Sequence, residues 1–170
     1  MNALSRGFRD AWSGEEYRVE PSEVILFAGS FGGPAGMLLS KDPRVTAVIG
    51  IAAVVDWQAP SPAEPLDWLY GFVKDAFGEG YRVSKASWNK LKRGRFYNPV
   101  AHPERIDPTK IMLIHAQDDE SVTYPPVASF ARARGIRLKT YKHGGHLSTS
   151  ILLKKPALWR QVARFIDKRR

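Results

Sequence analysis

The chain of 170 residues contains no cysteine. This absence excludes a disulfide framework, a thiol nucleophile and a thiolate metal site. Long apolar runs are also lacking, since the longest, residues 45–55, is broken by a threonine and a glycine and is too short to cross a bilayer. Residues 1–14 mix charged with apolar residues and do not resemble a signal peptide. We therefore expect a cytoplasmic protein with one hydrophobic core and no membrane partner.

Acidic residues are in the minority: the chain has 17 Asp and Glu residues against 26 Lys and Arg residues, which gives a formal net charge of +9. A nucleic-acid-binding protein would gather such an excess into a basic patch around a binding motif. Here the basic residues are scattered, with short clusters at 90–95, 154–155 and 168–170 and no binding motif around them. We expect no nucleic-acid partner, and interpret the charge as a solvated surface or as a feature that favours acidic substrates.

The apolar and turn-forming residues predict strands that alternate with helices. We expect strands at 23–28, 45–51, 111–115 and 136–141, and helices at 3–12, 31–39, 125–134 and 156–168. Helical segments at 66–77 and 84–91 interrupt the alternation. Alternating strands and helices imply right-handed crossovers, and therefore an α/β fold with a parallel sheet of about four strands and flanking helices. The whole chain, 1–170, is expected to form a single domain.

The most informative segment is residues 24–33, where a predicted apolar strand leads to Ser30 and a predicted helix follows. This pattern indicates a nucleophile elbow, a sharp strand-to-helix turn that strains the serine backbone and projects its Oγ away from the sheet. The neighbours two positions away, Ala28 and Gly32, must then be small, although the usual pattern has glycine at both places. An anion cradle at a helix N-terminus, or a helix-capping role for Ser30, is the alternative interpretation.

Two later strands end in loops that carry an acid and a histidine. Asp118 and Asp119 follow the strand at 111–115, and His146 follows the strand at 136–141. Serine, acid and histidine thus occur in the chain order of hydrolases with an elbow, each just past the carboxyl end of a predicted strand. The glycine pair before His146 lets its loop reach the elbow, so we predict His146 as the base. The other histidines are interpreted as a surface residue, His143, and as structural residues, His102 and His115.

Together these segments resemble the C-terminal half of an α/β-hydrolase catalytic domain, closest to the prolyl oligopeptidase-like (S9) serine peptidases and acyl hydrolases. The resemblance spans residues 23–146 and rests on AGSFGG at 28–33, VVDW at 54–57, YNP at 97–99, IDP at 106–108, HAQDDESV at 115–122 and GGH at 144–146. The acid loop has Ala116 where the family usually has glycine. The family pattern fits Asp119 as the acid, which leaves Asp118 as a turn or solvated residue and Asp56 as a third candidate.

The resemblance implies a serine hydrolase that acts on a small-molecule ester or a peptide and needs no metal or organic cofactor. Ser30 would attack the carbonyl, His146 would take the serine proton, and Asp119 would orient the imidazole. The backbone N–H of Phe31 would donate to the oxyanion. Peptidase, esterase and thioesterase activities all remain open.

The region 58–105 lies where α/β-hydrolases carry a helical lid. Its aromatic residues and those beside it are candidates to line an apolar pocket, although aromatic residues at helical spacing are more often core. These candidates are Trp57, Trp68, Tyr70, Phe72, Trp88, Phe96 and Tyr97. We expect Trp57 to contact substrate, because the resemblance places it near the functional edge of the sheet.

Complete α/β-hydrolases have several strands before the elbow strand, and one of their loops supplies the second oxyanion donor. Only residues 1–22 precede the elbow strand here, so we expect a partial domain without those strands. An impaired, hydrolase-like half-domain that acts as a binding or assembly module is therefore the alternative function. The strand at 23–28 would lie at an edge of the sheet, and we expect self-association through it.

Overall fold

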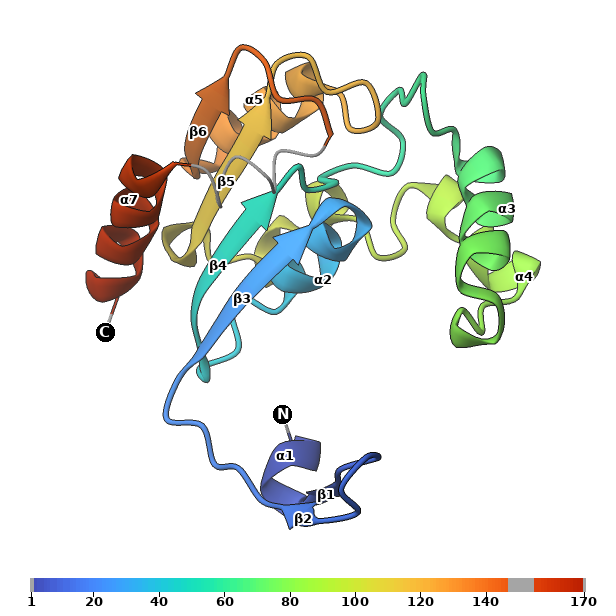
Figure 1. The fold of residues 1–170 in the computed structure, drawn as a ribbon. Coiled ribbons are helices and arrows are strands. Elements are labelled where there is room, and N and C mark those ends of the chain that lie inside the picture. The colour runs from blue at the N-terminus through green and yellow to red at the C-terminus, as the bar shows by residue number, and fades with distance from the viewer. Residues whose placement is uncertain (1, 147–154, 170) are drawn as a thin grey trace.

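The computed structural model describes residues 2–146 and 155–169. Its centre is a parallel sheet of four strands in the order β3-β4-β5-β6 (Figure 1). The strands are β3 Val24–Gly29, β4 Val45–Ile51, β5 Ile111–Ala116 and β6 Arg137–Tyr141. They lie within two residues of the predicted strands, and their parallel pairing confirms the predicted α/β fold class.

Helices cover both faces of this sheet and bury two separate apolar clusters. α2 (Gly33–Leu38) and α5 (Tyr124–Arg134) pack on one face, and α7 (Pro156–Asp167) packs on the other (Figure 1). Successive residues of β5 alternate between the clusters: Ile111 and Leu113 face the first, Met112 and Ile114 the second. A strand covered on both faces needs an apolar residue at every position, which explains the continuous apolar run in the sequence.

Two glycines let α2 pack closely on β3, β4 and the loop after β4. A Cβ atom at Gly33 would lie 2.5 Å from Cβ of Ala53, and one at Gly36 would lie 2.6 Å from Cβ of Ala28. The prediction that Ala28 must be small therefore agrees with its surroundings. At Gly32 a Cβ would meet no described atom within 4 Å outside its own turn, so the surrounding elements do not demand a small residue there. The close approach falls one residue later, at Gly33.

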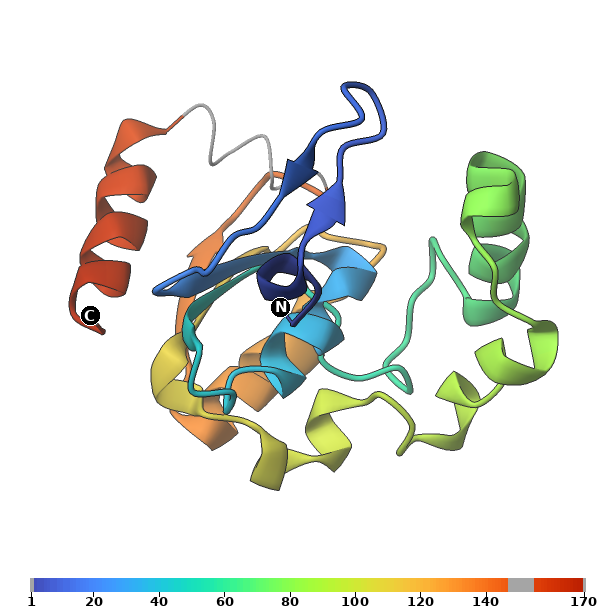
Figure 2. The same cartoon turned by 90° about the horizontal axis from the view of Figure 1, so that it is seen from below.

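The insertion between β4 and β5 forms a third apolar cluster of its own. It contains α3 (Leu66–Phe77) and α4 (Lys85–Trp88), with 3₁₀ turns η2 Gly78–Gly80, η3 Leu91–Arg93, η4 Pro99–Ala101, η5 Pro103–Arg105 and η6 Pro108–Lys110. Trp57, Leu69, Val73 and Trp88 are buried together in this cluster. Figures 1 and 2 show α3 and α4 to one side of the sheet, away from α7. The predicted helix 84–91 is shorter than expected and continues as η3.

The N-terminal segment differs from its prediction. Instead of one helix over 3–12, the chain forms α1 (Asn2–Arg6) and then an antiparallel pair, β1 (Phe8–Arg9) with β2 (Glu16–Tyr17). Gly7 has φ +100°, a conformation that ends a helix, and Oδ1 of Asp10 accepts from the backbone N–H groups of Trp12 and Ser13 to make a turn. Figure 1 shows this hairpin at a distance from the sheet. No helix in the described residues is long and apolar enough to cross a membrane.

Candidate active site

Ser30 adopts a strained backbone conformation at the carboxyl end of β3. Its φ is +48°, in the left-handed region that non-glycine residues rarely occupy, and it begins the 3₁₀ turn η1 (Ser30–Gly32) that leads into α2. The carbonyl oxygen of Ser30 accepts from the backbone N–H of Val54 at 3.0 Å, which ties the turn to the loop after β4. Ser30 occupies neither N-cap position, since the N-cap residues of η1 and α2 are Gly29 and Gly32. The geometry is that of an elbow rather than of a capped helix.

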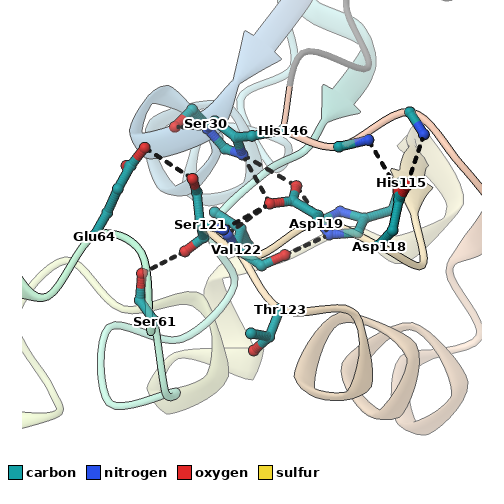
Figure 3. A network of polar contacts seen from close by, with 12 residues as sticks. Ser30, Ser61, Glu64, His115, Asp118, Asp119, Ser121, Val122, Thr123 and His146 are labelled. Atoms are coloured by element: carbon teal, nitrogen blue, oxygen red, sulfur yellow. Dashed lines mark hydrogen bonds and ion pairs between the residues drawn. The ribbon is translucent and has the colours of Figure 1, made fainter.

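The structure brings Ser30, His146 and Asp119 together in one chain of hydrogen bonds (Figure 3). Oγ of Ser30 lies 2.8 Å from Nε2 of His146, and Nδ1 of His146 lies 3.0 Å from Oδ2 of Asp119. Because a carboxylate only accepts, Nδ1 carries the proton that it donates to Asp119. In the neutral imidazole Nε2 is then free to accept the hydroxyl proton of Ser30.

The carboxylate of Asp119 is buried and held by its own loop. Oδ1 accepts from the backbone N–H groups of Ser121 at 3.0 Å and Val122 at 2.9 Å. These two bonds satisfy a charged group that is only 3% exposed, and they fix the direction in which it meets His146. The acid loop thus orients this carboxylate through its own backbone.

His115, on β5, supports the acid loop through a hydrogen bond, which agrees with its predicted structural role. Nε2 of His115 donates to the carbonyl oxygen of Val122 at 2.7 Å and lies 3.5 Å from Oδ2 of Asp119. Nδ1 has no hydrogen-bond partner among the described residues. Burial lowers the pKa of His115, which favours the neutral ring.

Asp118 lies outside the chain of hydrogen bonds but has a role that sequence reasoning missed. Its carboxylate accepts from the backbone N–H groups of Gly145 at 2.9 Å and Gly144 at 3.3 Å. These bonds, above all the one from Gly145, lower the pKa of Asp118. Asp118 thus holds the loop that presents His146, whereas His143 is exposed as predicted, with 88% of its side chain accessible.

The remaining acid and histidine candidates bond elsewhere. Oδ1 of Asp56 accepts from Nδ2 of Asn98 and from the backbone N–H of Gln58, both within 2.9 Å. His102 contacts the carbonyl oxygen of Arg95 and the carboxylate of Glu104. Neither residue contacts His146 or Ser30 among the described hydrogen bonds.

The electrostatic surroundings raise the pKa of His146 above its ordinary value. The hydrogen bond to Asp119 is the largest cause that raises the pKa of His146, burial opposes it, and the charges of Asp119 and Glu64 add to the rise. An imidazole in this setting is a stronger base than an isolated histidine. Among the described residues, no group of three or more His, Asp or Glu side chains is placed to hold a metal ion.

A cavity of about 270 Å³ opens beside Ser30. Phe31 and Trp57 line it, together with the acid loop at 121–123 and residues 59–61 and 64–66 of the insertion. The indole N–H of Trp57 donates to the carbonyl oxygen of Tyr97 at 2.8 Å, which fixes the ring. The other aromatic candidates do not line this cavity: Trp68 and Phe72, for example, stack on each other at 5.2 Å on the exposed side of α3.

The first part of the insertion is bonded to the acid loop. The hydroxyl of Ser61 donates to the carbonyl oxygen of Ser121 at 2.5 Å, and that of Thr123 donates to the carbonyl oxygen of Pro60 at 2.9 Å. The hydroxyl of Ser121 donates to Oε1 of Glu64 at 2.8 Å (Figure 3). These contacts join segments about sixty residues apart, so no local pattern in the sequence predicts them.

Comparison with solved structures identifies the fold. The chain is similar to an esterase of Pyrococcus furiosus, with a TM-score of 0.55 and 18% identity over 86% of this chain and 54% of the esterase. It is also similar to an acylaminoacyl peptidase of Pyrococcus horikoshii, with a TM-score of 0.51 and 15% identity over 76% of this chain and 21% of the peptidase. The chain thus spans about half of the esterase and a fifth of the peptidase. No family model and no curated protein matches it.

These likenesses define the class: the chain has the α/β-hydrolase fold, as its motifs led us to expect. Within that fold it comprises a four-stranded parallel sheet with flanking helices.

Proposed function

We propose that this chain is a serine hydrolase that cleaves an ester or peptide bond, similar in its chemistry to the S9 serine peptidases and related esterases. The observation that carries the proposal is the hydrogen-bonded series from Ser30 through His146 to Asp119, built on a serine at φ +48°. A serine in an ordinary helix-capping role would need neither the strained backbone nor an imidazole with a buried carboxylate behind it.

In the proposed reaction, Oγ of Ser30 attacks the carbonyl carbon while Nε2 of His146 takes the hydroxyl proton. Asp119 stabilises the imidazolium that forms, and the same proton is then given to the leaving amine or alkoxide. Water hydrolyses the acyl-serine by the reverse sequence of proton transfers. Phe31 follows Ser30 in η1, where the first backbone N–H groups have no partner within the turn, and its N–H is our candidate oxyanion donor.

The insertion 58–105 is proposed to act as a lid whose first part forms one wall of the substrate cavity. Its bonds to the acid loop at Ser61, Ser121 and Thr123 support this assignment. Trp57, held by Tyr97 and lining the cavity, is proposed to contact the substrate.

Covalent labelling with a fluorophosphonate probe tests the function. We expect the probe to modify Ser30, and Ser30→Ala to abolish labelling. Ser121→Ala is the matched control, because Ser121 lines the same cavity but does not contact His146, and this variant should still be labelled. Labelling that survives Ser30→Ala would remove Ser30 as the nucleophile.

The alternative function is an impaired half-domain that binds or assembles with a partner. The position of β3 favours this alternative, because an edge strand can pair with a partner. Within the described sheet β3 pairs only with β4, and Phe27 on β3 is 51% exposed. Turnover of p-nitrophenyl esters and peptide amides separates the two functions. A folded chain that neither turns over these substrates nor reacts with the probe would favour the assembly module.

A further inference from the structure

The cavity beside Ser30 carries a charge opposite to that of the whole chain. Two carboxylates, Asp56 and Glu64, line it. The described part of the chain contributes no lysine, arginine or histidine side chain to its wall. The net charge of +9 therefore does not describe the surface that a substrate would meet, and the expectation that the charge favours acidic substrates does not fit this cavity.

The two carboxylates differ in how much of their bonding capacity is used. Asp56 is committed to its own loop and to Asn98. Glu64 accepts one hydrogen bond, from the hydroxyl of Ser121 to Oε1. Among residues 2–146 and 155–169, no lysine or arginine forms an ion pair with Glu64. A carboxylate has about four acceptor positions, so Glu64 retains capacity for a further donor.

The backbone around Glu64 is held in place before any substrate arrives. The N–H of Ala63 donates to the carbonyl oxygen of Glu120 at 3.4 Å, the hydroxyl of Ser61 bonds Ser121, and prolines at 60, 62 and 65 restrict the segment. A charge presented on a fixed segment loses little conformational entropy when it binds a ligand. Ser121 also connects Glu64 to the acid loop, since its own N–H donates to Asp119 (Figure 3).

We propose that Glu64, held by Ser121, binds a cationic group of the substrate, an ammonium or a guanidinium, in the cavity beside Ser30. The proposal rests on the function proposed above and narrows its substrate class to esters or amides that carry a positive charge near the scissile carbonyl. The cation would meet no competing positive side chain on the described cavity wall, and the apolar residues Trp57, Leu66 and Val122 would cover its hydrocarbon stem.

Paired substrates test the proposal in the active protein. The ratio of kcat/KM for the p-nitrophenyl esters of N-acetyl-lysine and N-acetyl-norleucine reports the preference for the charge, because losses common to both esters cancel. We expect the wild type to prefer the lysine ester, and Glu64→Gln to lower the ratio roughly tenfold or more, as for the loss of a hydrogen bond to a charged group. Glutamine keeps an oxygen for Ser121, so the variant should unfold at a similar temperature.

Glu79→Gln is the matched control, since Glu79 is an exposed acid on η2 outside the cavity wall. It removes the same charge from the molecule and should leave the ratio unchanged. An equal fall in both variants would mean that the preference comes from the general field of the protein and would overturn the proposal. An unchanged ratio in Glu64→Gln would overturn it as well.

Binding to a variant that lacks the nucleophile separates this inference from the proposed reaction. In Ser30→Ala, we expect isothermal titration to show benzamidine, a cation, binding at least about tenfold more tightly than neutral benzamide. Adding Glu64→Gln should remove the difference. If benzamidine binds more tightly in this way but the wild type shows no turnover, the hydrolase function is wrong and the cation-binding cavity remains. Equal affinities for the two ligands in Ser30→Ala would refute the role of Glu64.

Discussion

At the scale of single residues, Asp118 and Asp119 are adjacent in sequence and differ in their contacts. Asp119 bonds His146, whereas Asp118 bonds the backbone of Gly144 and Gly145. We predict that Asp119→Asn lowers kcat/KM by roughly 10⁴-fold, because the amide no longer fixes the proton on Nδ1. Asp118→Asn should be mild, since its Oδ1 can still accept from Gly145. Steady-state kinetics with one ester decide the ranking, and equal losses would contradict the assignment.

The protonation of His146 gives a second prediction at this scale. A general base must be neutral, so activity is lost as the pH falls through its pKa, and Asp119 raises that pKa above the ordinary 6.5. We expect the acid limb of kcat/KM to have its midpoint above pH 6.5. In Asp119→Asn the largest cause of the rise is removed, and the His146 ring resonance, followed by NMR, should titrate at lower pH. A wild-type midpoint below 6.5 would contradict this electrostatic account.

The residues of the candidate site differ in how far the sequence predicts them. Ser30, Asp119 and His146 follow from local patterns, since each comes after the carboxyl end of a strand whose position the apolar runs define. The roles of Asp118, Ser121 and Glu64 depend on contacts between loops that lie tens of residues apart. Such contacts are decided by tertiary packing, and only the arrangement of the loops in space reveals them.

At the scale of elements, the approach of α2 to the loop after β4 depends on Gly33. A Cβ atom there would lie 2.5 Å from Cβ of Ala53 and 3.1 Å from the backbone nitrogen of Val54, so Gly33→Ala must displace the backbone. We predict a loss of about 1–3 kcal/mol in the free energy of unfolding, as for other overpacked sites. Gly32→Ala is the matched control, one residue away with φ −74° and open space around it. Chemical denaturation of both variants measures the difference, and equal stabilities would refute the packing argument.

The elements that the sequence predicts well are those with a continuous apolar face. Strands β3 to β6 and helices α3, α5 and α7 fall close to their expected positions because burial and apolar pattern coincide. The N-terminal hairpin is the exception. The residues of β1 and β2 are exposed and belong to none of the three apolar clusters. Their conformation therefore depends on local features, the turn at Asp10 and the positive φ of Gly7. A helical spacing of apolar residues was too weak a signal there.

At the scale of the whole molecule, three apolar clusters divide the chain into a sheet domain and an insertion. The two clusters on the faces of the sheet build the scaffold that carries Ser30, Asp119 and His146. The third cluster lies within the insertion and its neighbours, and it holds Trp57 at the cavity. The site therefore lies where the carboxyl ends of the strands meet the insertion, the usual position for chemistry on a parallel sheet.

The open edge of β3 gives the prediction at this scale. Within the described sheet β3 has one neighbouring strand. Phe27 on β3 is 51% exposed, and Trp159 of α7 packs against it at 6.1 Å between ring centres. An apolar edge with unpaired backbone groups is a template for pairing with another strand. We predict that the purified chain self-associates through β3, and that light scattering coupled to gel filtration reports a dimer or larger species.

Phe27→Lys should shift this equilibrium toward the monomer, because a charge on an edge strand opposes strand pairing. Phe72→Lys provides the matched control: Phe72 is 49% exposed on α3, away from the edge, and its replacement removes a similar apolar area. If both variants dissociate alike, general surface hydrophobicity drives association and the edge of β3 does not. A wild-type chain that stays monomeric at high concentration would show that the edge of β3 does not recruit a partner, and would also weaken the assembly-module alternative that this edge supports.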